Sequence, residues 1–411
     1  MNLNLARYID RWLGLAVCFV LWVVGQVEGL FTGRMLPGLR ATTPPQSWRI
    51  PAPPARVLGV KFYGLGNIAM ILPTLQAMRE RLPDCEIDFL TLPGNVSLLE
   101  QSGLVAHTLT VDVRSFGKFL VSVVRLLGVL RGRRYDAILD FEQFMKLSGV
   151  FAFFTGAPVR VGFNTEGQAR GWLYSHRIAY ADTDHMADIF MRIAAPFDAA
   201  LHPAPRVRLT VDAASEARAR AVAGPGAIVA IHIGTGPNYN KIAIKRWDLR
   251  RFAELADALV ERHAVRIVFT GQGAEEAGLI EEARAGMRHR DASLSACDRL
   301  SVSELIALLS LSSFVVSNDT SAMHLAGLVA RPVVAFFGPT LPRIYGPRGE
   351  NDLVFYKSLY CSPCLSNYNL KISRCVDNVC MQAITVAEVI AGIESHFLLP
   401  DVAAVGRAAT N

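Results

Sequence analysis

Four polar residues lie close together in a chain that is 51% hydrophobic: Asp319, Thr320, Ser321 and His324. They follow an apolar run at 314–317 and begin a helical pattern, so we expect them where a strand ends and a helix starts. In open α/β sheets, ligands bind outside the carboxyl ends of the strands. Asp319 or Thr320 can cap the helix while its free N–H groups face a phosphate. The sequence therefore favours a ligand site here, with a well-capped helix in an ordinary βαβ unit as the alternative.

A second set of candidates follows the strands predicted at 227–233 and 265–270. Thr235 lies in the turn after the first of these strands, and Lys245 lies in the loop before the next helix. A lysine attracts a diphosphate most strongly in a closed site from which water is excluded. The glycine turn after the second strand and the helix that follows it, which begins near Glu275, suit a ribose or phosphate contact. A solvated basic loop, and the preference of first helical turns for glutamate, are the alternatives.

Residues 317–340 read SNDTSAMHLAGLVARPVVAFFGPT. This stretch closely resembles the signature of glycosyltransferase family 9, the ADP-heptose:lipopolysaccharide heptosyltransferases and their relatives. The family pattern is roughly (S/T/G)-N-D-T-G-x-x-H-L-A followed by P-x-V-x-x-F-G-x-T, and the chain departs from it at Ser321, where glycine is usual. The resemblance extends more weakly over most of 56–395. It implies the α/β fold called GT-B, in which two doubly wound, Rossmann-like parallel-sheet domains face each other across a cleft.

The resemblance also implies an activity and roles for residues of the second half. The activity is the inverting transfer of a sugar, for example heptose from ADP-heptose, to a lipid-linked saccharide such as lipopolysaccharide core. Lys245 would contact the diphosphate of the donor, and Glu275 the ribose hydroxyls. Asp319 would contact the sugar hydroxyls, while the two residues after it would hold the diphosphate. His324 would orient this loop, or it is a buried structural histidine.

The first strand-to-helix turn carries Gly64 and Gly66, and glycine there lets the backbone approach a ligand closely. A plain tight turn explains these two glycines equally well. In the resembling family the turn ends in Gly-Asp, and that aspartate is taken as the general base. This chain has Asn67 instead, and an amide cannot accept a proton at neutral pH. Either another group is the base, or the chain binds a sugar nucleotide with altered or lost catalysis.

Three other residues are candidates for the missing base. Asp140 and Glu142 lie at the end of a predicted strand, 135–141, which should reach the same edge of the sheet as the glycine turn. His185 is the third candidate because neutral imidazole is a competent base near pH 7. Its neighbours include several helix-capping residues, so a place beside a helix N-terminus is the alternative. No Asp-x-Asp metal motif follows a strand, and we expect transfer without a catalytic cofactor.

Four cysteines have the spacing C-x₂-C-x₁₀-C-x₄-C: Cys361, Cys364, Cys375 and Cys380. Four thiolates at such spacing can bind a structural zinc ion. In a cytosolic protein this is favoured over two disulfides. A disulfide or a cluster of reduced thiols is the alternative.

The N-terminal region contains a long apolar segment at 12–31 with no charge before Glu28. Its length is about that needed to cross a bilayer core of roughly 30 Å. We expect it to associate with a membrane, either spanning it or lying in the interface, and a helix packed on a soluble domain is the alternative. The basic residues after the segment predict that the main body lies on the cytoplasmic side, and the resemblance implies that the membrane is the bacterial inner membrane.

The composition is mildly basic, with a formal net charge of +6. This suits anionic partners, including a phospholipid surface or a nucleotide diphosphate. There is no block of like charges, so nucleic-acid binding is not indicated. At 411 residues the chain suits two domains. The predicted division is a membrane-associating segment (1–33), a Pro-rich linker (34–55), an acceptor-binding domain (56–200), a connection (201–225), a donor-binding domain (226–395, with the cysteines at 361–380) and a tail (396–411).

Overall fold

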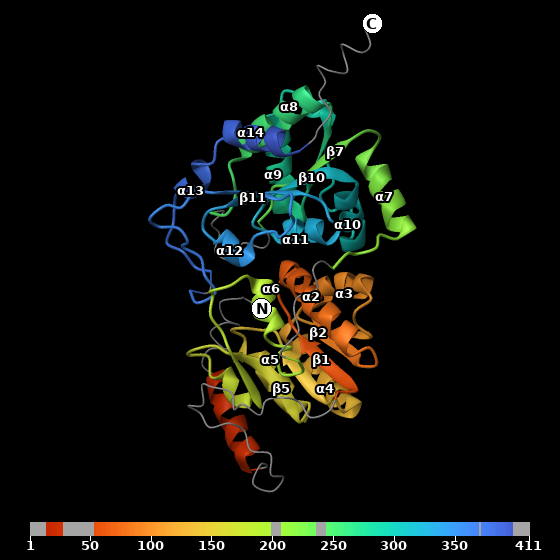
Figure 1. The fold of residues 1–411 in the computed structure, drawn as a ribbon, viewed down its shortest axis with the longest axis vertical. Coiled ribbons are helices and arrows are strands. Elements are labelled where there is room, and N and C mark those ends of the chain that lie inside the picture. The colour runs from red at the N-terminus through yellow and green to blue at the C-terminus, as the bar shows by residue number, and fades with distance from the viewer. Residues whose placement is uncertain (1–13, 28–52, 199–206, 236–243, 370, 398–411) are drawn as a thin grey trace, which may run out of the picture. The chain divides into compact units, whose positions relative to one another are not determined.

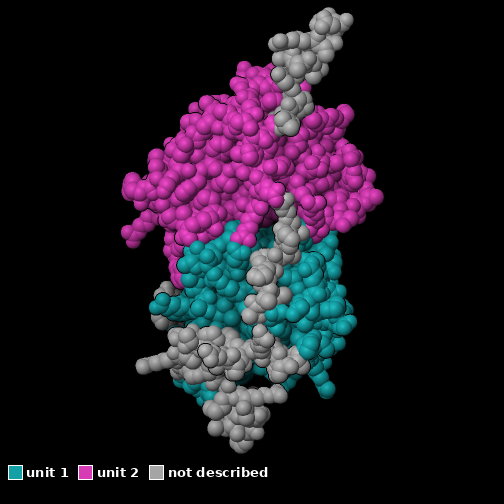
Figure 2. Space-filling view, in the orientation of Figure 1, with its two compact units in different colours: residues 1–207 teal, residues 208–411 magenta. Residues whose placement is uncertain are grey.

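A computed structural model describes residues 14–27, 53–198, 207–235, 244–369 and 371–397. The chain divides into two compact units, Met1–Val207 and Arg208–Asn411 (Figure 2). Each unit contains one six-stranded sheet in which all strands are parallel. The two doubly wound α/β sheets expected from the sequence are therefore confirmed.

The first unit alternates strands and helices, as Figure 1 shows. Its strand order is β3-β2-β1-β4-β5-β6, so the direction of winding reverses between β1 and β4. The strands form because their apolar runs are buried, as expected for a sheet covered on both faces. The elements are β1 (Arg56–Val60), α2 (Leu65–Arg81), β2 (Glu86–Thr91), α3 (Val96–Ser102), β3 (His107–Thr110), α4 (Phe116–Arg133), β4 (Ala137–Asp140), α5 (Lys146–Phe154), β5 (Val159–Asn164), β6 (His176–Ala179) and α6 (Met186–Met191), with single 3₁₀ turns at Pro93–Asn95 and Arg170–Leu173.

The second unit has the strand order β12-β11-β10-β7-β8-β9, with the reversal between β7 and β10. These two central strands pair directly, and His232 lies opposite Ser317 at their carboxyl ends. The elements are α7 (Ala213–Ala223), β7 (Ile228–His232), α8 (Leu249–His263), β8 (Arg266–Thr270), α9 (Gly273–Ala285), β9 (Ser293–Ser295), α10 (Val302–Leu311), β10 (Ser312–Asn318), α11 (Ser321–Leu328), β11 (Val333–Phe337), α12 (Pro342–Tyr345), β12 (Leu353–Tyr356), α13 (Val379–Gln382) and α14 (Val386–His396), with a 3₁₀ turn at Arg290–Ala292.

The segment expected to connect the domains, 201–225, contains the boundary between the units but also contains α7. The carboxylate of Asp212 caps this helix by accepting a hydrogen bond from the backbone N–H of Ser215. Ala219 and Val222 are buried and pack in a cluster with Leu308 of α10. Because α7 buries one face in the second unit, its residues belong to that unit. The rest of the predicted connection at 201–206 lies outside the described residues.

Residues 14–27 form a helix within the first unit. Cys18 and Leu21 are buried on its inner side, where Val150 and Phe153 of α5 pack against them. No helix in the described parts of the chain is both long and apolar enough to cross a membrane. The remainder of the predicted apolar segment, and most of the Pro-rich linker, lie outside the described residues.

Candidate functional site

Two of the predicted site residues of the second unit, Lys245 and Asp319, lie where β7 and β10 end. This is the point at which the strand order reverses, and such a point is where doubly wound sheets bind ligands. The Nζ atom of Lys245 lies 2.6 Å from Oδ2 of Asp319 and donates a hydrogen bond of 3.1 Å to the carbonyl oxygen of the same residue. Thr340 donates a hydrogen bond of 2.7 Å to the same carboxylate oxygen. The structure thus brings the predicted Lys245 and Asp319 into direct contact.

The environment of Asp319 keeps its carboxylate ionised. Burial raises the pKa of this carboxyl group, but the charges of Lys245 and Lys371 and the hydrogen bond from Thr340 outweigh burial, so the pKa lies below its usual range. The buried charge is compensated, which makes it tolerable in this part of the protein. The end of β10 therefore carries an ionised carboxylate that can accept hydrogen bonds.

Two residues of the family-like motifs to which we assigned no role hold the loop that carries Lys245. The amide of Asn318 accepts a hydrogen bond from the backbone N–H of Trp247 (3.0 Å) and donates one to the carbonyl of Ile233 (2.8 Å). The indole of Trp247 is fully buried and donates to the carbonyl of Ile384. These bonds join the loop after β7 to the end of β10, so the position of Lys245 is fixed by the core. The sequence carries a signal for this arrangement, since Lys245, Arg246 and Trp247 match the K-x-W pattern of the resembling family.

The predicted helix after β10 is α11, and its first turn has the expected cap. The hydroxyl of Thr320 accepts a hydrogen bond from the N–H of Ala322 and also contacts the hydroxyl of Ser317. Ser321 is the first residue of the helix, and His324 is half-buried one turn further on. The N-terminus of α11 therefore points its backbone donors and the positive end of its dipole towards the carboxyl edge of the sheet.

Thr235 and Arg246 carry buried polar atoms that lack a partner. The hydroxyl oxygen of Thr235 and the Nε atom of Arg246 make no hydrogen bond within the part of the chain that the structure describes. Thr235 follows β7 and Arg246 follows Lys245 in the chain, so these two orphaned groups are candidates to bind a polar ligand at this end of the sheet. A ligand with oxygen atoms would satisfy both.

The glycine turn after β8 presents two glutamates in different ways. Glu275 is largely exposed, with one carboxylate oxygen 3.6 Å from the Arg246 guanidinium. Glu276 instead turns back and accepts a hydrogen bond of 2.8 Å from the N–H of Gln272. A Cβ atom at Gly234 would lie 2.0 Å from a Glu276 carboxylate oxygen, so only glycine allows this approach. Sequence reasoning chose Glu275 and overlooked Glu276, because neighbouring glutamates cannot be told apart without the fold.

The first unit also has a lysine–carboxylate pair where its strand order reverses. Lys61 follows β1 and its Nζ atom lies 2.9 Å from a carboxylate oxygen of Glu142, which follows β4. The other carboxylate oxygen accepts a hydrogen bond of 2.8 Å from the N–H of Phe62. Burial raises the pKa of Glu142, but the charge of Lys61 and the hydrogen bonds lower it by more than burial raises it. The pKa of Glu142 therefore lies below its usual range. Glu142 is ionised and holds the backbone at the start of the glycine turn.

Asp140 lies deeper than Glu142 and is completely enclosed. Its Oδ2 atom is 2.7 Å from an Arg170 guanidinium nitrogen and accepts a hydrogen bond of 2.5 Å from the hydroxyl of Tyr174. Its Oδ1 atom accepts the backbone N–H of Glu142. Asp140 and the two side chains that contact its carboxylate, Arg170 and Tyr174, are all fully buried. This geometry is that of a structural ion pair, since a substrate hydroxyl has no route to the carboxylate.

The remaining residues predicted near the acceptor lie in or beside short loops. Gly64 has a φ of 94°, a conformation that favours glycine, and it precedes α2. Gly66 and Asn67 are therefore in the first turn of α2, and the amide of Asn67 donates to the carbonyl of Tyr63 (3.1 Å). His185 caps α6 and accepts the N–H of Ala187 at Nδ1. The lone pair of the neutral imidazole thus already accepts a hydrogen bond. This agrees with the alternative prediction that His185 lies at a helix N-terminus.

The four predicted metal ligands are free thiols gathered in one region of the second unit. The pKa of the Cys380 thiol is raised to about 11, chiefly by burial and in smaller part by charge repulsion from Cys364, Cys375 and Cys361. No three of these sulfur atoms lie within mutual coordination distance in the described residues. Asn378, between two of the cysteines, donates to the carbonyls of Ile244 and Arg246. This segment therefore supports the loop that carries Lys245.

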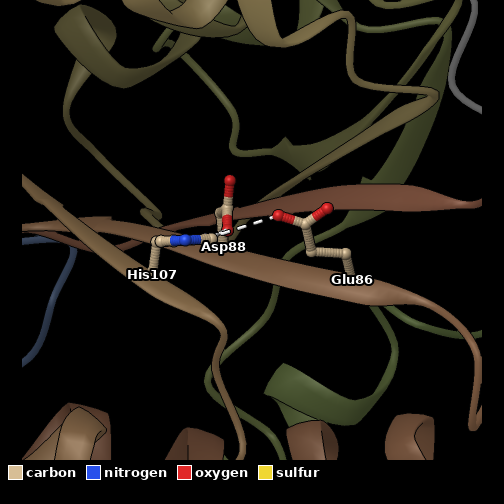
Figure 3. A group of neighbouring side chains, drawn as sticks. All are labelled: Glu86, Asp88 and His107. Carbon is tan, nitrogen blue, oxygen red and sulfur yellow. Dashed lines mark hydrogen bonds and ion pairs between the residues drawn. The ribbon is translucent and has the colours of Figure 1, made fainter.

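Figure 3 shows another group with metal-binding side chains: Glu86 and Asp88 on β2 and His107 on β3. These residues lie near the amino ends of their strands, away from the edge at which ligands bind. The guanidinium of Arg133 lies 2.5 Å from one carboxylate oxygen of Asp88, and the hydroxyl of Tyr135 donates to the same oxygen. A cation already neutralises this group, which indicates a structural ion-pair network.

Comparison with known proteins gives a consistent result. Residues 123–372, more than half of the chain, match glycosyltransferase family 9 (heptosyltransferase). Lipopolysaccharide heptosyltransferase 1 of Pseudomonas aeruginosa is 27% identical over 325 residues, which cover 75% of this chain and 86% of that protein.

Two solved structures are similar in fold. The E. coli ADP-heptose lps heptosyltransferase II has a TM-score of 0.65 at 17% identity and covers 83% of this chain and 98% of its own. The E. coli heptosyltransferase WaaC with ADP-2-deoxy-2-fluoro heptose has a TM-score of 0.60 at 18% identity and covers 83% and 99%. The two Rossmann-like units thus have the GT-B type of fold.

Proposed function

We propose a donor, an acceptor and a mechanism for this chain on the premise that it belongs to glycosyltransferase family 9, the heptosyltransferases. The chain transfers heptose from ADP-heptose to a lipid-linked saccharide, such as lipopolysaccharide core, with inversion at the anomeric carbon. The donor class is supported by the similarity to the structures of an ADP-heptose lps heptosyltransferase and of a heptosyltransferase with ADP-2-deoxy-2-fluoro heptose. The observation that carries the proposal is the contact of Lys245 with Asp319 where the strand order of the second unit reverses.

In this proposal the second unit binds the donor. The ammonium of Lys245 and the backbone donors at the start of α11 stabilise the negative charge that develops on the departing ADP. Asp319, ionised and held by Lys245 and Thr340, accepts hydrogen bonds from sugar hydroxyls. The orphaned hydroxyl of Thr235 gains an oxygen partner from the diphosphate. Lys245 and the N-terminus of α11 supply the positive charge that other transferases take from a metal ion.

The first unit binds the acceptor, whose hydroxyl attacks the anomeric carbon from the side opposite ADP. This attack inverts the configuration, and the hydroxyl proton passes to a base. Among the four candidates Glu142 is favoured. Asp140 is enclosed, the lone pair of neutral His185 is used in a cap, and the amide of Asn67 is not basic. Glu142 is ionised and adjoins the turn that carries Asn67.

A second function is supported by Asn67 alone. If no group replaces the aspartate that the resembling family has here, the chain binds ADP-heptose without efficient transfer. The test is to measure binding and turnover with a panel of nucleotide sugars, using the wild-type protein and Asn67→Asp. Turnover of ADP-heptose by the wild type supports the transferase. Tight binding without turnover, together with turnover gained in Asn67→Asp, supports the second function, and no binding of ADP-heptose contradicts both.

Two further parts of the proposal concern structure and location. We propose one structural zinc ion at the four residues of the cysteine cluster on the basis of their C-x₂-C-x₁₀-C-x₄-C spacing and their gathering in one region of the second unit, and binding would require their sulfur atoms to move closer together. The protein works at the cytoplasmic face of the inner membrane, where a lipid-linked acceptor would be found. The apolar N-terminal segment and the mildly basic composition support this location.

A further inference from the structure

Helix α4 exposes an apolar surface in the first unit. Phe116, Leu120, Val121 and Val124 are each more than half exposed. The opposite side of the helix is buried and packs against the core of the unit through residues that include Leu126. One face of the helix therefore packs in the core of the unit, and the described chain leaves a second apolar face uncovered. Exposed apolar groups of this extent usually mark an interaction surface.

The same stretch is strongly basic. From residue 114 to residue 134 the chain has six arginines or lysines and no acidic residue. Arg114 and Arg133 are held in ion pairs within the first unit. The other four are not paired with any acidic residue that the structure describes: Lys118, Arg125, Arg131 and Arg134. A helix with exposed apolar side chains and unpaired cations, and without anions, has the composition of helices that lie in the interface of an anionic membrane.

The N-terminal helix adds a second uncovered apolar surface to the first unit. Residues 14–27 contain no charged side chain, and Phe19, Val20 and Val23 are exposed. This helix packs on α5, and α5 in turn packs beside α4. Phe154, at the end of α5, is also exposed. Three neighbouring helices thus present apolar side chains, and the basic residues of α4 supply the charge.

We propose that α4, together with the N-terminal helix, docks the first unit onto an anionic phospholipid bilayer. Apolar side chains enter the acyl boundary while the long stems of lysine and arginine carry their charges to the headgroups. A second copy of the chain fits this surface less well than a bilayer does. In a twofold-symmetric pair, the same basic patch of both copies would meet and repel. The inference deepens the proposed function, from which it takes the lipid-linked acceptor, but its evidence lies only in these helices.

The experiment uses the full-length protein and vesicle flotation. Vesicles of phosphatidylcholine alone are compared with vesicles that also contain phosphatidylglycerol. We expect the wild type to float with the anionic vesicles only, and high salt to release it. The double variant Val121→Asp, Val124→Asp should lower the partition coefficient about tenfold or more, since it places two carboxylates in the interface. The matched control, Ala217→Asp with Ala221→Asp on the exposed side of α7, should bind as the wild type does.

A second variant tests the charges without adding anions. Replacing Lys118, Arg125 and Arg131 with glutamine should weaken binding to anionic vesicles on the order of 100-fold. Circular dichroism and the affinity for ADP-heptose should not change in either variant, because neither touches the second unit. Wild-type binding that both variants retain would overturn the proposal. So would a wild-type dimer that ignores vesicles and dissociates in the aspartate variant. Vesicle binding in a protein that fails to bind ADP-heptose would support docking while refuting the proposed function.

Discussion

The ammonium of Lys245 lies 2.6 Å from the carboxylate of Asp319 and donates a hydrogen bond to the carbonyl of that same residue. The two residues come from the loops after the two central strands of the second unit. Their contact therefore fixes the distance between a cation and an anion at the carboxyl edge of the sheet. A site of this kind needs little rearrangement to bind a diphosphate beside Lys245 and a sugar beside Asp319.

Glu142→Gln should lower kcat by at least about 100-fold, which is typical for loss of a general base, and should leave the Kd for ADP-heptose unchanged. The pKa of Glu142 lies below its usual range, so wild-type turnover should fall only at distinctly acidic pH. The measurement is the pH profile of kcat/KM with donor binding determined separately. A kcat within a few-fold of wild type in a folded variant would remove Glu142 from the mechanism.

Asp140→Asn should act on stability instead. Removing one partner of a buried ion pair leaves the Arg170 guanidinium uncompensated, and we expect the free energy of unfolding to fall by about 3–5 kcal/mol. Urea denaturation measures this change. Asp112→Asn is the control, because its pair with Arg114 is on the surface and should contribute nothing measurable. Equal stability of Asp140→Asn and wild type would contradict the buried-pair interpretation.

Much of the second unit could be predicted from its sequence, because its strands are continuous apolar runs that end in polar turns. The turn at Asp319 was visible for this reason. The partner of Asp140 was not, because Arg170 lies thirty positions away in a loop with no periodicity. Helix α7 was assigned to a linker because its region is rich in proline and alanine. The Asp212 cap was a signal for this helix that sequence reasoning did not use.

The stability of the fold should fall as the pH is lowered from about 7.5 to about 5.5. Burial lowers the pKa of His232, with Glu276 and Thr270 only partly offsetting this, and burial together with Arg160 lowers the pKa of His176. The unfolded chain then takes up protons that the folded chain does not. Each histidine contributes at most about 1.4 kcal/mol per pH unit.

Urea denaturation at several pH values tests this dependence. His232→Gln should reduce the slope of the unfolding free energy against pH, whereas His396→Gln, at an exposed position, should leave the slope unchanged. A stability that rises on acidification through this range would show that the sign is wrong. An unchanged slope in His232→Gln would show that this histidine is not among its causes.

The cysteine cluster should contain close to one equivalent of zinc in purified protein. Cys361→Ser should lose the metal, and Cys297→Ser, which changes a cysteine outside the cluster, should retain it. Because Asn378 joins this segment to the loop of Lys245, loss of the metal should also weaken donor binding. Elemental analysis that covers zinc and iron provides the measurement. A metal-free wild type, or full metal content in Cys361→Ser, would rule out the zinc site.

The most direct measurement is calorimetric titration of ADP-heptose into the wild type and Lys245→Gln, with Arg250→Gln as a control for loss of a nearby exposed cation. Lys245→Gln should bind roughly 10- to 100-fold more weakly, the loss expected for one hydrogen bond to a charged group. Arg250→Gln should bind as tightly as the wild type. If the wild type binds ADP-heptose and Lys245→Gln binds it equally well, the diphosphate does not lie at the Lys245–Asp319 contact.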